Sequence, residues 1–193
     1  MIEAAESAGL QIKGVFDTSD NLSKDVLSYK IIGTDFDIPK YVKECDFVVT
    51  VGFIKSPQIN ILIHEKVIKA NGRFATIIAS TAYVSKYATI EKEVVIMHNA
   101  FVNAGAVIGF GSIINNFADI EHDVRIGQHC HISTGVMING ESVIGENIFI
   151  GSQSVVANNI TICPNCIIGA GSVVRHDITE SGIYAGNPIK RIK

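Results

Sequence analysis

The chain has 193 residues, 47% of them hydrophobic and 18% charged, so it can bury a sizeable core and does not have the composition of a disordered protein. Its formal net charge of −3 supplies no basic field for binding nucleic acid. It has no signal-peptide pattern, no apolar run of the roughly 20 residues that span a membrane, and no disulfide framework among its four cysteines, so we expect a cytoplasmic protein without membrane insertion.

The first part of the chain alternates between helical and strand patterns with short connections. Helices are expected at residues 2–8, 38–44 and 57–70, and strands at 12–16, 47–51 and 74–78. Asn71-Gly72 provides the stop signal of the longest helix. Such alternation is typical of a small parallel α/β domain.

From residue 78 onward the sequence follows a six-residue repeat. A period of six fits neither a helix nor one long strand, but it fits short strands joined by turns, each strand forming one face of a prism. Four residues after each branched position stands a second position that is always small or aliphatic. The branched positions are Ile78, Val84, Ile90, Ile96, Val102, Ile108, Ile114, Ile120, Ile126, Ile132, Ile138, Ile144, Ile150, Val156, Ile162, Ile168 and Val174.

Three of these hexads are expected to make one 18-residue coil, with each branched side chain stacked on its equivalent in the next coil. Glycines recur directly after the branched position, where turns need them: Gly109, Gly127, Gly145, Gly151 and Gly169. A β-sandwich with accidental spacing is the alternative, and seventeen consecutive matches argue against it.

Residues 78–178 resemble the hexapeptide-repeat acyltransferases, whose β-helix is left-handed; the handedness comes from the resemblance, because spacing does not determine it. The whole pattern resembles the family of sialic-acid O-acetyltransferases and UDP-4-amino-sugar N-acetyltransferases. The resemblance implies a mainly β protein, a left-handed parallel β-helix preceded by a small Rossmann-like α/β domain. That domain is expected to be truncated, because the family's opening strand and Gly-rich turn have no counterpart here.

The resemblance also assigns roles to the two parts of the chain. Residues 1–76 would bind a nucleotide-sugar substrate, and residues 77–193, with a C-terminal cap, would bind acetyl-CoA and carry out catalysis. Asp17, in the segment VFD, and Gly52, in TVGF, occupy places where the family contacts the nucleotide-sugar. The alternative interpretation of the two residues is a cap at the end of a strand and a turn glycine.

Acetyl transfer needs a base that takes a proton from the acceptor, and histidine is the usual choice. The segment Ile120-Glu121-His122-Asp123-Val124 places an imidazole in a turn beside two carboxylates, either of which could orient it. It resembles the family's catalytic signature, which implies His122 as the base and Asp123 as its partner. Without the resemblance, such a turn histidine is more often a surface residue.

The evidence for a functional role is weaker for the other histidines. His131 matches a family histidine that contacts acetyl-CoA, which implies a hydrogen-bond donor near the thioester; a plain turn histidine is the alternative. His129 has no family counterpart. We expect His64 at the surface of its helix, and His98 and His176 in solvated turns.

Acetyl-CoA, as co-substrate, is expected in the groove between neighbouring β-helices. By resemblance Ser152 and Ala170 lie along its pantetheine arm, and Lys190 and Arg191, in a tail similar to that of CoA-dependent hexapeptide enzymes, could meet its phosphates. Ordinary turn residues and a solubilising cap are the alternatives. No metal is expected, because the only Cys pair, Cys163-Pro164-Asn165-Cys166, lacks the second pair of a zinc site.

The expected function is direct transfer of an acetyl group to the amine of a nucleotide-linked amino sugar, in a homotrimer with active sites between subunits, as the family has. A sugar or sialic-acid O-acetyltransferase is the first alternative. A zinc carbonic anhydrase on the same scaffold, and a scaffold without activity, also remain open.

Overall fold

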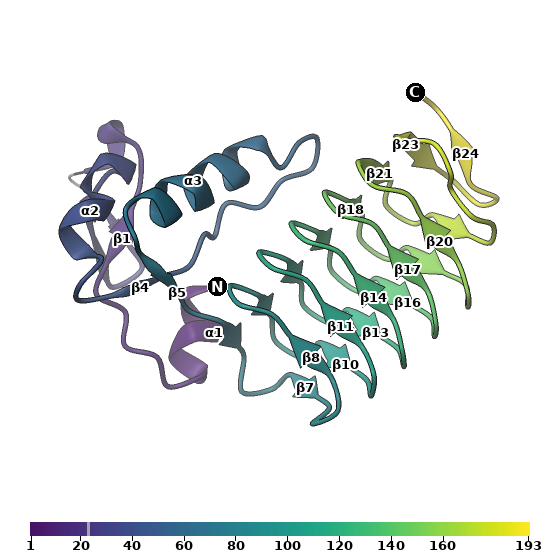
Figure 1. The fold of residues 1–193 in the computed structure, drawn as a ribbon, viewed down its shortest axis with the longest axis horizontal. Helices are drawn as coiled ribbons and strands as arrows, with labels where there is room; N and C mark the ends of the chain where they lie inside the picture. Colours follow the sequence, from purple (N-terminus) through teal and green to yellow (C-terminus); the bar gives the residue numbers. More distant parts are fainter. Residues whose placement is uncertain (23) are drawn as a thin grey trace.

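The computed structural model describes residues 1–22 and 24–193, which form a small α/β part beside a long stack of coils (Figure 1). The stack is a parallel β-helix with three sheets. Paired strands come from successive coils, and partner residues are 18 apart, as in Phe101 opposite Asp119. Three hexads therefore make one coil, which confirms the interpretation of the repeat.

Each sheet is named here by its first and last strand. The β7–β22 sheet contains β7 (Tyr83–Val84), β10 (Phe101–Val102), β13 (Asp119–Ile120), β16 (Met137–Ile138), β19 (Val155–Val156) and β22 (Val173–Val174). The β8–β20 sheet contains β8 (Thr89–Ile90), β11 (Val107–Ile108), β14 (Arg125–Ile126), β17 (Val143–Ile144) and β20 (Thr161–Ile162). The β6–β24 sheet contains β6 (Ile77–Ile78), β9 (Val95–Ile96), β12 (Ile113–Ile114), β15 (His131–Ile132), β18 (Phe149–Ile150), β21 (Cys166–Ile168), β23 (Gly182–Ala185) and β24 (Lys190–Arg191).

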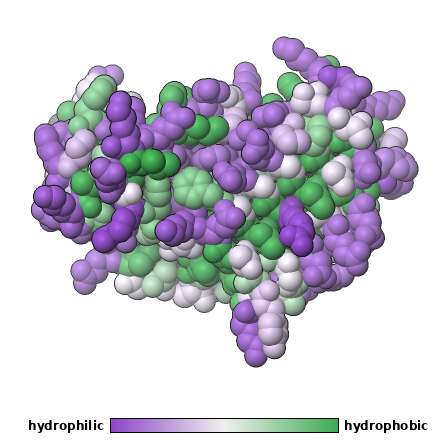
Figure 2. Space-filling model, in the orientation of Figure 1, coloured by the Kyte–Doolittle hydropathy of each residue, from purple (hydrophilic) through white to green (hydrophobic). Residues whose placement is uncertain are grey.

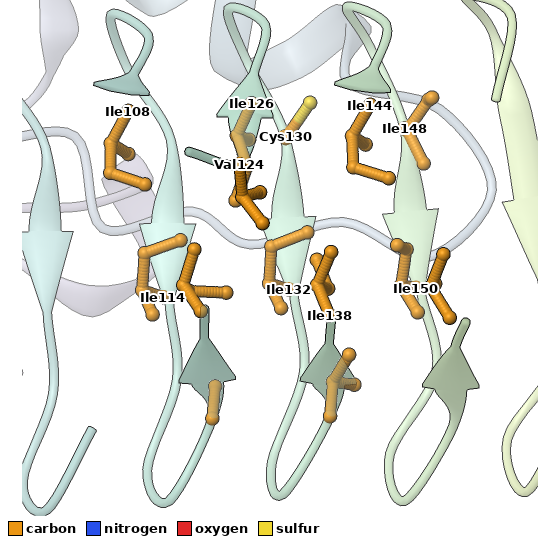
Figure 3. Packing of buried hydrophobic residues seen from close by; sticks show 14 of the residues in the cluster. Ile108, Ile114, Val124, Ile126, Cys130, Ile132, Ile138, Ile144, Ile148 and Ile150 are labelled. Atoms are coloured by element: carbon orange, nitrogen blue, oxygen red, sulfur yellow. The ribbon is translucent and has the colours of Figure 1, made fainter. Parts of the chain in front are cut away.

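The branched residues point into the prism and stack in columns (Figure 3). From Ile96 to Val174 each repeat position is at most 3% exposed, and burial of one such side chain contributes about 1.5–3 kcal/mol. Ile78 is 36% exposed, because it lies in the first coil and is covered from one side only. The coils also need glycine: a Cβ on Gly127 would lie 2.7 Å from the backbone nitrogen of Glu146 in the next coil.

Residues 1–74 form the expected α/β part, with differences in detail. Two predicted strands shrink to two residues each, and an unpredicted hairpin follows β1. The elements are α1 (Ile2–Ser7), β1 (Val15–Phe16), η1 (Ser19–Asn21), β2 (Asp25–Val26), β3 (Tyr29–Gly33), η2 (Asp35–Asp37), α2 (Ile38–Tyr41), β4 (Asp46–Phe47), α3 (Gln58–Lys69) and β5 (Arg73–Phe74). Strands β1 and β3 pair in parallel, as do β4 and β5, whereas β2 and β3 are antiparallel.

This α/β part packs on the outer surface of the β6–β24 sheet. Ala4 and Ala5 of α1 share a buried hydrophobic cluster with Ile77, Val95 and Ile113, all of which point outward from the sheet. Figure 2 shows hydrophobic residues along the coils, on a face of the β-helix that the α/β part does not cover. None of the helices in residues 1–22 and 24–193 is long and apolar enough to span a membrane.

Candidate active site

His122 lies in the turn between β13 and β14, at an outer corner of the β-helix, with half of its side chain exposed. Its Nδ1 is 3.1 Å from Oδ2 of Asp123. A carboxylate can only accept, so Nδ1 carries the hydrogen and Nε2 is left with a free lone pair. A neutral imidazole in this tautomer has the form required of a general base.

The neighbouring carboxylate, Glu121, points elsewhere. Its Oε2 accepts a hydrogen bond from Nδ2 of Asn103 in the preceding coil at 2.7 Å. The structure therefore answers which acid reaches the ring of His122: it is Asp123. Asp123 has a φ of 59°, which Asp tolerates better than most residues, and its other oxygen lies against Gly105, where a Cβ would collide with it.

Two further residues of this corner escaped the sequence analysis. The His122 ring lies against Gly140 of the next coil, where a Cβ would come 2.5 Å from Nε2. Asp119 points outward from β13, and burial together with the charge of Glu121 raises its pKa. Its Oδ1 is buried without a hydrogen-bond partner among the described residues. Asp119 is the only acid in the outward column of the β7–β22 sheet, and that is the signal by which the sequence could have shown it.

His131 lies on the outer surface of β15, beneath the α/β part. Its Nδ1 donates to the carbonyl oxygen of Phe53 at 3.0 Å, and burial lowers the pKa of the ring. Gly52 lies next to it, because a Cβ there would be 3.1 Å from Cε1 of His131. Since Nδ1 carries the hydrogen, Nε2 is an acceptor. This differs from the donor role that the resemblance implies for His131.

Within one chain the two histidines do not share a site. His122 lies at the corner between the β7–β22 and β8–β20 sheets, whereas His131 lies on the outer surface of the β6–β24 sheet. His129 is at a third place, the corner between β14 and β15. In the part of the chain that the structure covers, no three His, Cys, Asp or Glu side chains converge as they would around a metal ion.

The expected CoA contacts lie at the corner that follows the β6–β24 sheet. Oγ of Ser152 is 2.8 Å from Oγ of Ser133 in the preceding coil, and the carbonyl of Ser152 accepts from the amide of Gly171, next to Ala170. The structure thus brings Ser152 and Ala170 together in successive coils.

The C-terminal tail and Asp17 are held by the chain itself. Arg191 forms an ion pair with Glu180 at 2.5 Å, so its guanidinium is engaged in the cap, whereas Lys190 is exposed. Oδ1 of Asp17 accepts from the amide of Thr18 at 2.6 Å, which lowers the pKa of the carboxyl. This contact fits a strand-end cap, which is one of the two interpretations of Asp17, and the contact with the nucleotide-sugar stays a prediction.

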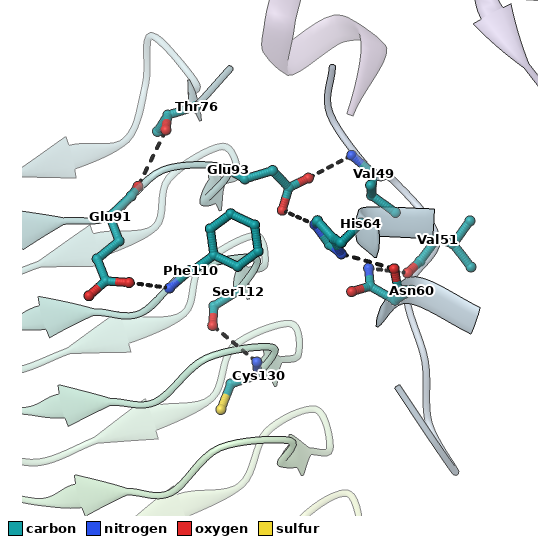
Figure 4. Close-up of polar contacts among 10 residues, drawn as sticks. All are labelled: Val49, Val51, Asn60, His64, Thr76, Glu91, Glu93, Phe110, Ser112 and Cys130. Carbon is teal, nitrogen blue, oxygen red and sulfur yellow. Dashed lines mark hydrogen bonds and ion pairs between the residues drawn. The ribbon is translucent and has the colours of Figure 1, made fainter. Parts of the chain in front are cut away.

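The prediction for His64 is wrong. The side chain is 2% exposed and lies between α3 and the β-helix, 2.6 Å from Glu93 (Figure 4). The helical pattern was correct, but the face of α3 that carries Asn60, His64 and Val67 is buried. The i, i+4, i+7 spacing of these three residues is the signal that the sequence offered.

Known proteins share both the repeat and the fold. Residues 105–140 and 141–176 match the family described as bacterial transferase hexapeptide (six repeats). A variant of perosamine N-acetyltransferase from Caulobacter crescentus, solved with CoA and GDP-perosamine, superposes with a TM-score of 0.92 at 26% identity, over 100% of this chain and 90% of that chain. The acetyltransferase domain of PglB from Neisseria gonorrhoeae with acetyl coenzyme A gives 0.90 at 29% identity, over 98% and 91%.

The curated relatives match a shorter stretch. UDP-3-O-acylglucosamine N-acyltransferase of Bordetella avium is 34% identical over 102 residues, which are 51% of this chain and 28% of the relative. The chain thus spans less than a third of that relative's length. Residues 105–176 thus match the bacterial transferase hexapeptide family, and the chain as a whole is a hexapeptide-repeat protein with the left-handed β-helix and α/β part of the perosamine N-acetyltransferase and the PglB acetyltransferase domain on which it superposes.

Proposed function

We propose that this chain is a cytoplasmic acetyltransferase that moves the acetyl group of acetyl-CoA to an amino group of a nucleotide-linked amino sugar. The observation that carries the proposal is the half-exposed imidazole of His122, whose Nδ1 is held by Asp123 and whose Nε2 is free to accept a proton. The superposition over the whole chain on an N-acetyltransferase solved with CoA and GDP-perosamine supports the choice of donor and acceptor.

In the proposed reaction the sugar nitrogen attacks the thioester carbonyl of acetyl-CoA in a ternary complex. Nε2 of His122 takes the proton that the nitrogen loses, and Asp123 stabilises the imidazolium that forms. The tetrahedral intermediate then collapses, the C–S bond breaks, and CoA leaves with the proton returned from His122. Backbone N–H groups at the coil corners stabilise the oxyanion, a contribution on the order of 3 kcal/mol.

The two parts of the chain take different substrates in this proposal. Residues 77–193 bind acetyl-CoA through Ser152, Ala170 and the C-terminal tail with Lys190 and Arg191, and His131 contributes an acceptor nitrogen there. Residues 1–76 bind the nucleotide-sugar with Asp17 and Gly52. The contact between Gly52 and His131 supports this division, because it joins the α/β part to the β-helix at the histidine that we propose to meet acetyl-CoA.

We propose a homotrimer, in which a neighbouring chain completes each site. His122 and His131 lie on different sides of one β-helix, so a groove between two chains would bring one of each together. The outward residues of the β7–β22 sheet also favour association, because most are apolar and Tyr83 and Met137 are 56% and 41% exposed in the single chain. These outward residues are Tyr83, Phe101, Asp119, Met137, Val155 and Val173.

A direct test incubates the full chain with acetyl-CoA and three acceptors: a UDP-4-amino-sugar, GDP-perosamine and free sialic acid. We expect CoA release and an acetylated product with at least one amino sugar and none with sialic acid. Acetylation of sialic acid alone would reassign the enzyme to O-transfer. If the protein binds acetyl-CoA in calorimetry but releases no CoA with any of the three acceptors, the proposed acceptor class is contradicted.

A further inference from the structure

A buried His–Glu pair joins helix α3 to the β-helix. Glu93, in the turn between β8 and β9, is 1% exposed, and His64 on α3 is 2% exposed. Nε2 of His64 lies 2.6 Å from Oε2 of Glu93, and its Nδ1 donates to the carbonyl oxygen of Asn60 at 2.9 Å (Figure 4). Because both partners of the ring are acceptors, one proton is shared between His64 and Glu93, whichever residue carries it.

Glutamate is an unusual residue at this corner. Glu93 has a φ of 62°, in the left-handed region that favours glycine and asparagine. The equivalent corners of later coils have similar positive φ values and carry Gly111, His129, Asn147 and Asn165. Such a backbone conformation persists where other contacts hold it, and for Glu93 those contacts lie on the α/β part.

The pair anchors the segment that follows β4. Oε1 of Glu93 accepts from the amide of Val49 at 2.6 Å, and Nδ2 of Asn60 donates to the carbonyl oxygen of Val51 at 3.0 Å (Figure 4). The rings of Phe74 and Phe110 lie 5.4 and 5.1 Å from the His64 ring and keep water away from it. In this apolar surrounding the hydrogen bonds are stronger than they would be in water.

The other end of the same segment lies on His131. Gly52 approaches the ring closely, and the carbonyl oxygen of Phe53 accepts from Nδ1 at 3.0 Å. The contacts therefore run without a break from Glu93 and His64 through Asn60 and residues 49–53 to His131.

We propose that Glu93, His64 and Asn60 are positioning residues, which hold residues 49–53 over the β-helix and so fix His131 in the tautomer with hydrogen on Nδ1. None of the three reaches the corner of His122. Their effect is to present Nε2 of His131 as an acceptor in a constant position. The consequence for acetyl transfer rests on the proposed function, whereas the effect on the tautomer does not.

The tautomer can be read by nitrogen NMR of protein labelled with ¹⁵N-histidine, at pH 8, where His131 is neutral. His131→Gln identifies the signals by subtraction. In the wild type we expect hydrogen on Nδ1 of His131 and none on Nε2. Glu93→Ala and Asn60→Ala each remove an anchor of residues 49–53, so hydrogen is expected to move to Nε2 in a majority of molecules.

Glu93→Gln is the conservative variant. Its amide oxygen can accept from Val49 and its NH₂ can donate to Nε2 of a neutral His64, so we expect the wild-type tautomer. Exposed Glu65 on α3 provides the control, and Glu65→Ala should also leave the tautomer unchanged. If acetyl transfer is found, Glu93→Ala should lower kcat/KM for acetyl-CoA about tenfold and Glu93→Gln less than twofold.

The proposal is overturned if His131 keeps its hydrogen on Nδ1 in Glu93→Ala and Asn60→Ala alike. Should Glu93→Ala fail to fold, Asn60→Ala decides alone, because it removes the hydrogen bond to Val51 and leaves the His64–Glu93 contact in place. A protein without acetyltransferase activity that still shows the tautomer shift would contradict the proposed function and support the positioning role.

Discussion

The ring of His122 lies against the backbone of Gly140 in the next coil, so closely that a Cβ would come 2.5 Å from Nε2. Nε2 is the atom to which the proposed mechanism gives the proton. The absence of a side chain at residue 140 is therefore what lets the imidazole occupy its place, and this relationship can be tested without touching the histidine.

Gly140→Ala is expected to push the His122 ring away from its position and to lower kcat/KM about tenfold or more, because a displaced base no longer aligns with the acceptor. Steady-state kinetics with acetyl-CoA and the amino sugar measures the loss. The double variant His122→Ala/Gly140→Ala is the control. It should be no slower than His122→Ala alone, since the effect of the new methyl group passes through the ring. Additive losses in the double variant would contradict this explanation.

Asp123→Asn tests which carboxylate supports His122. Asparagine keeps the size of the side chain and tolerates the φ of 59°, but it cannot stabilise an imidazolium by charge. We expect kcat to fall about tenfold or more with KM little changed. Glu121→Gln is the matched comparison and should have a smaller effect on kcat, because Glu121 is bound to Asn103. A larger effect of Glu121→Gln would reverse the two roles.

His129 makes the free energy of unfolding depend on pH. Burial and the neighbouring His64 lower its pKa from 6.5 to about 4. The unfolded chain thus binds a proton between about pH 6.5 and 4 that the folded chain does not, so stability is lost as the pH falls through this range. With His129 half-buried, solvent screening reduces the contribution to about 1–2 kcal/mol.

Urea unfolding of wild type and His129→Asn at pH 7.5 and 5 isolates this contribution, because His64 and Glu93 are present in both proteins. Asparagine suits the left-handed corner, as Asn147 does one coil later. The loss of stability between the two pH values should be smaller in His129→Asn by that amount. Equal losses in both proteins would show that His129 is not held neutral.

A charge in the outward column of the β7–β22 sheet should prevent association. Met137→Glu places a carboxylate on a surface that we propose to be covered in the trimer, where an unpaired charge is costly. Sedimentation velocity should show a trimer for the wild type and a monomer for Met137→Glu. Thr161→Glu, in the outward column of the β8–β20 sheet, is the control and should leave the trimer intact. A wild-type monomer at micromolar concentration would contradict the proposal.

The β-helix could be predicted because its cause is local and repeated. Each coil needs the same branched residue at the same place, so Ile and Val at every sixth position give the period, the strand positions and the buried core. The same pattern could also have predicted which outer surface of the β-helix is covered. The outward residues Ile77, Val95 and Ile113 recur at the spacing of one coil, Phe149 follows two coils later, and all four are buried, which marks the surface that the α/β part covers.

The site could be predicted only in part. His122 was predicted as the base from the resemblance of its segment to a catalytic signature, and that role stays a prediction. Gly140 and Asn103 come from adjacent coils and matter through contacts that no local pattern shows. The prediction that His64 lies at the surface was wrong, because the helix sequence alone does not show that a carboxylate from the β-helix pairs with this histidine. The sequence around Glu93 does indicate such a pairing, since it has an acid at a corner position where the later coils have glycine, histidine or asparagine.

The central claim, that His122 is the base of an acetyl transfer, is tested most directly by His122→Asn with binding and turnover measured on the same protein. Asparagine can keep the hydrogen bond to Asp123 but cannot take up a proton, so calorimetry should show acetyl-CoA binding within about threefold of the wild type while kcat falls at least about a hundredfold. His176→Ala, at an exposed corner near the C-terminal cap, should change neither quantity. Unchanged turnover in His122→Asn would contradict the account.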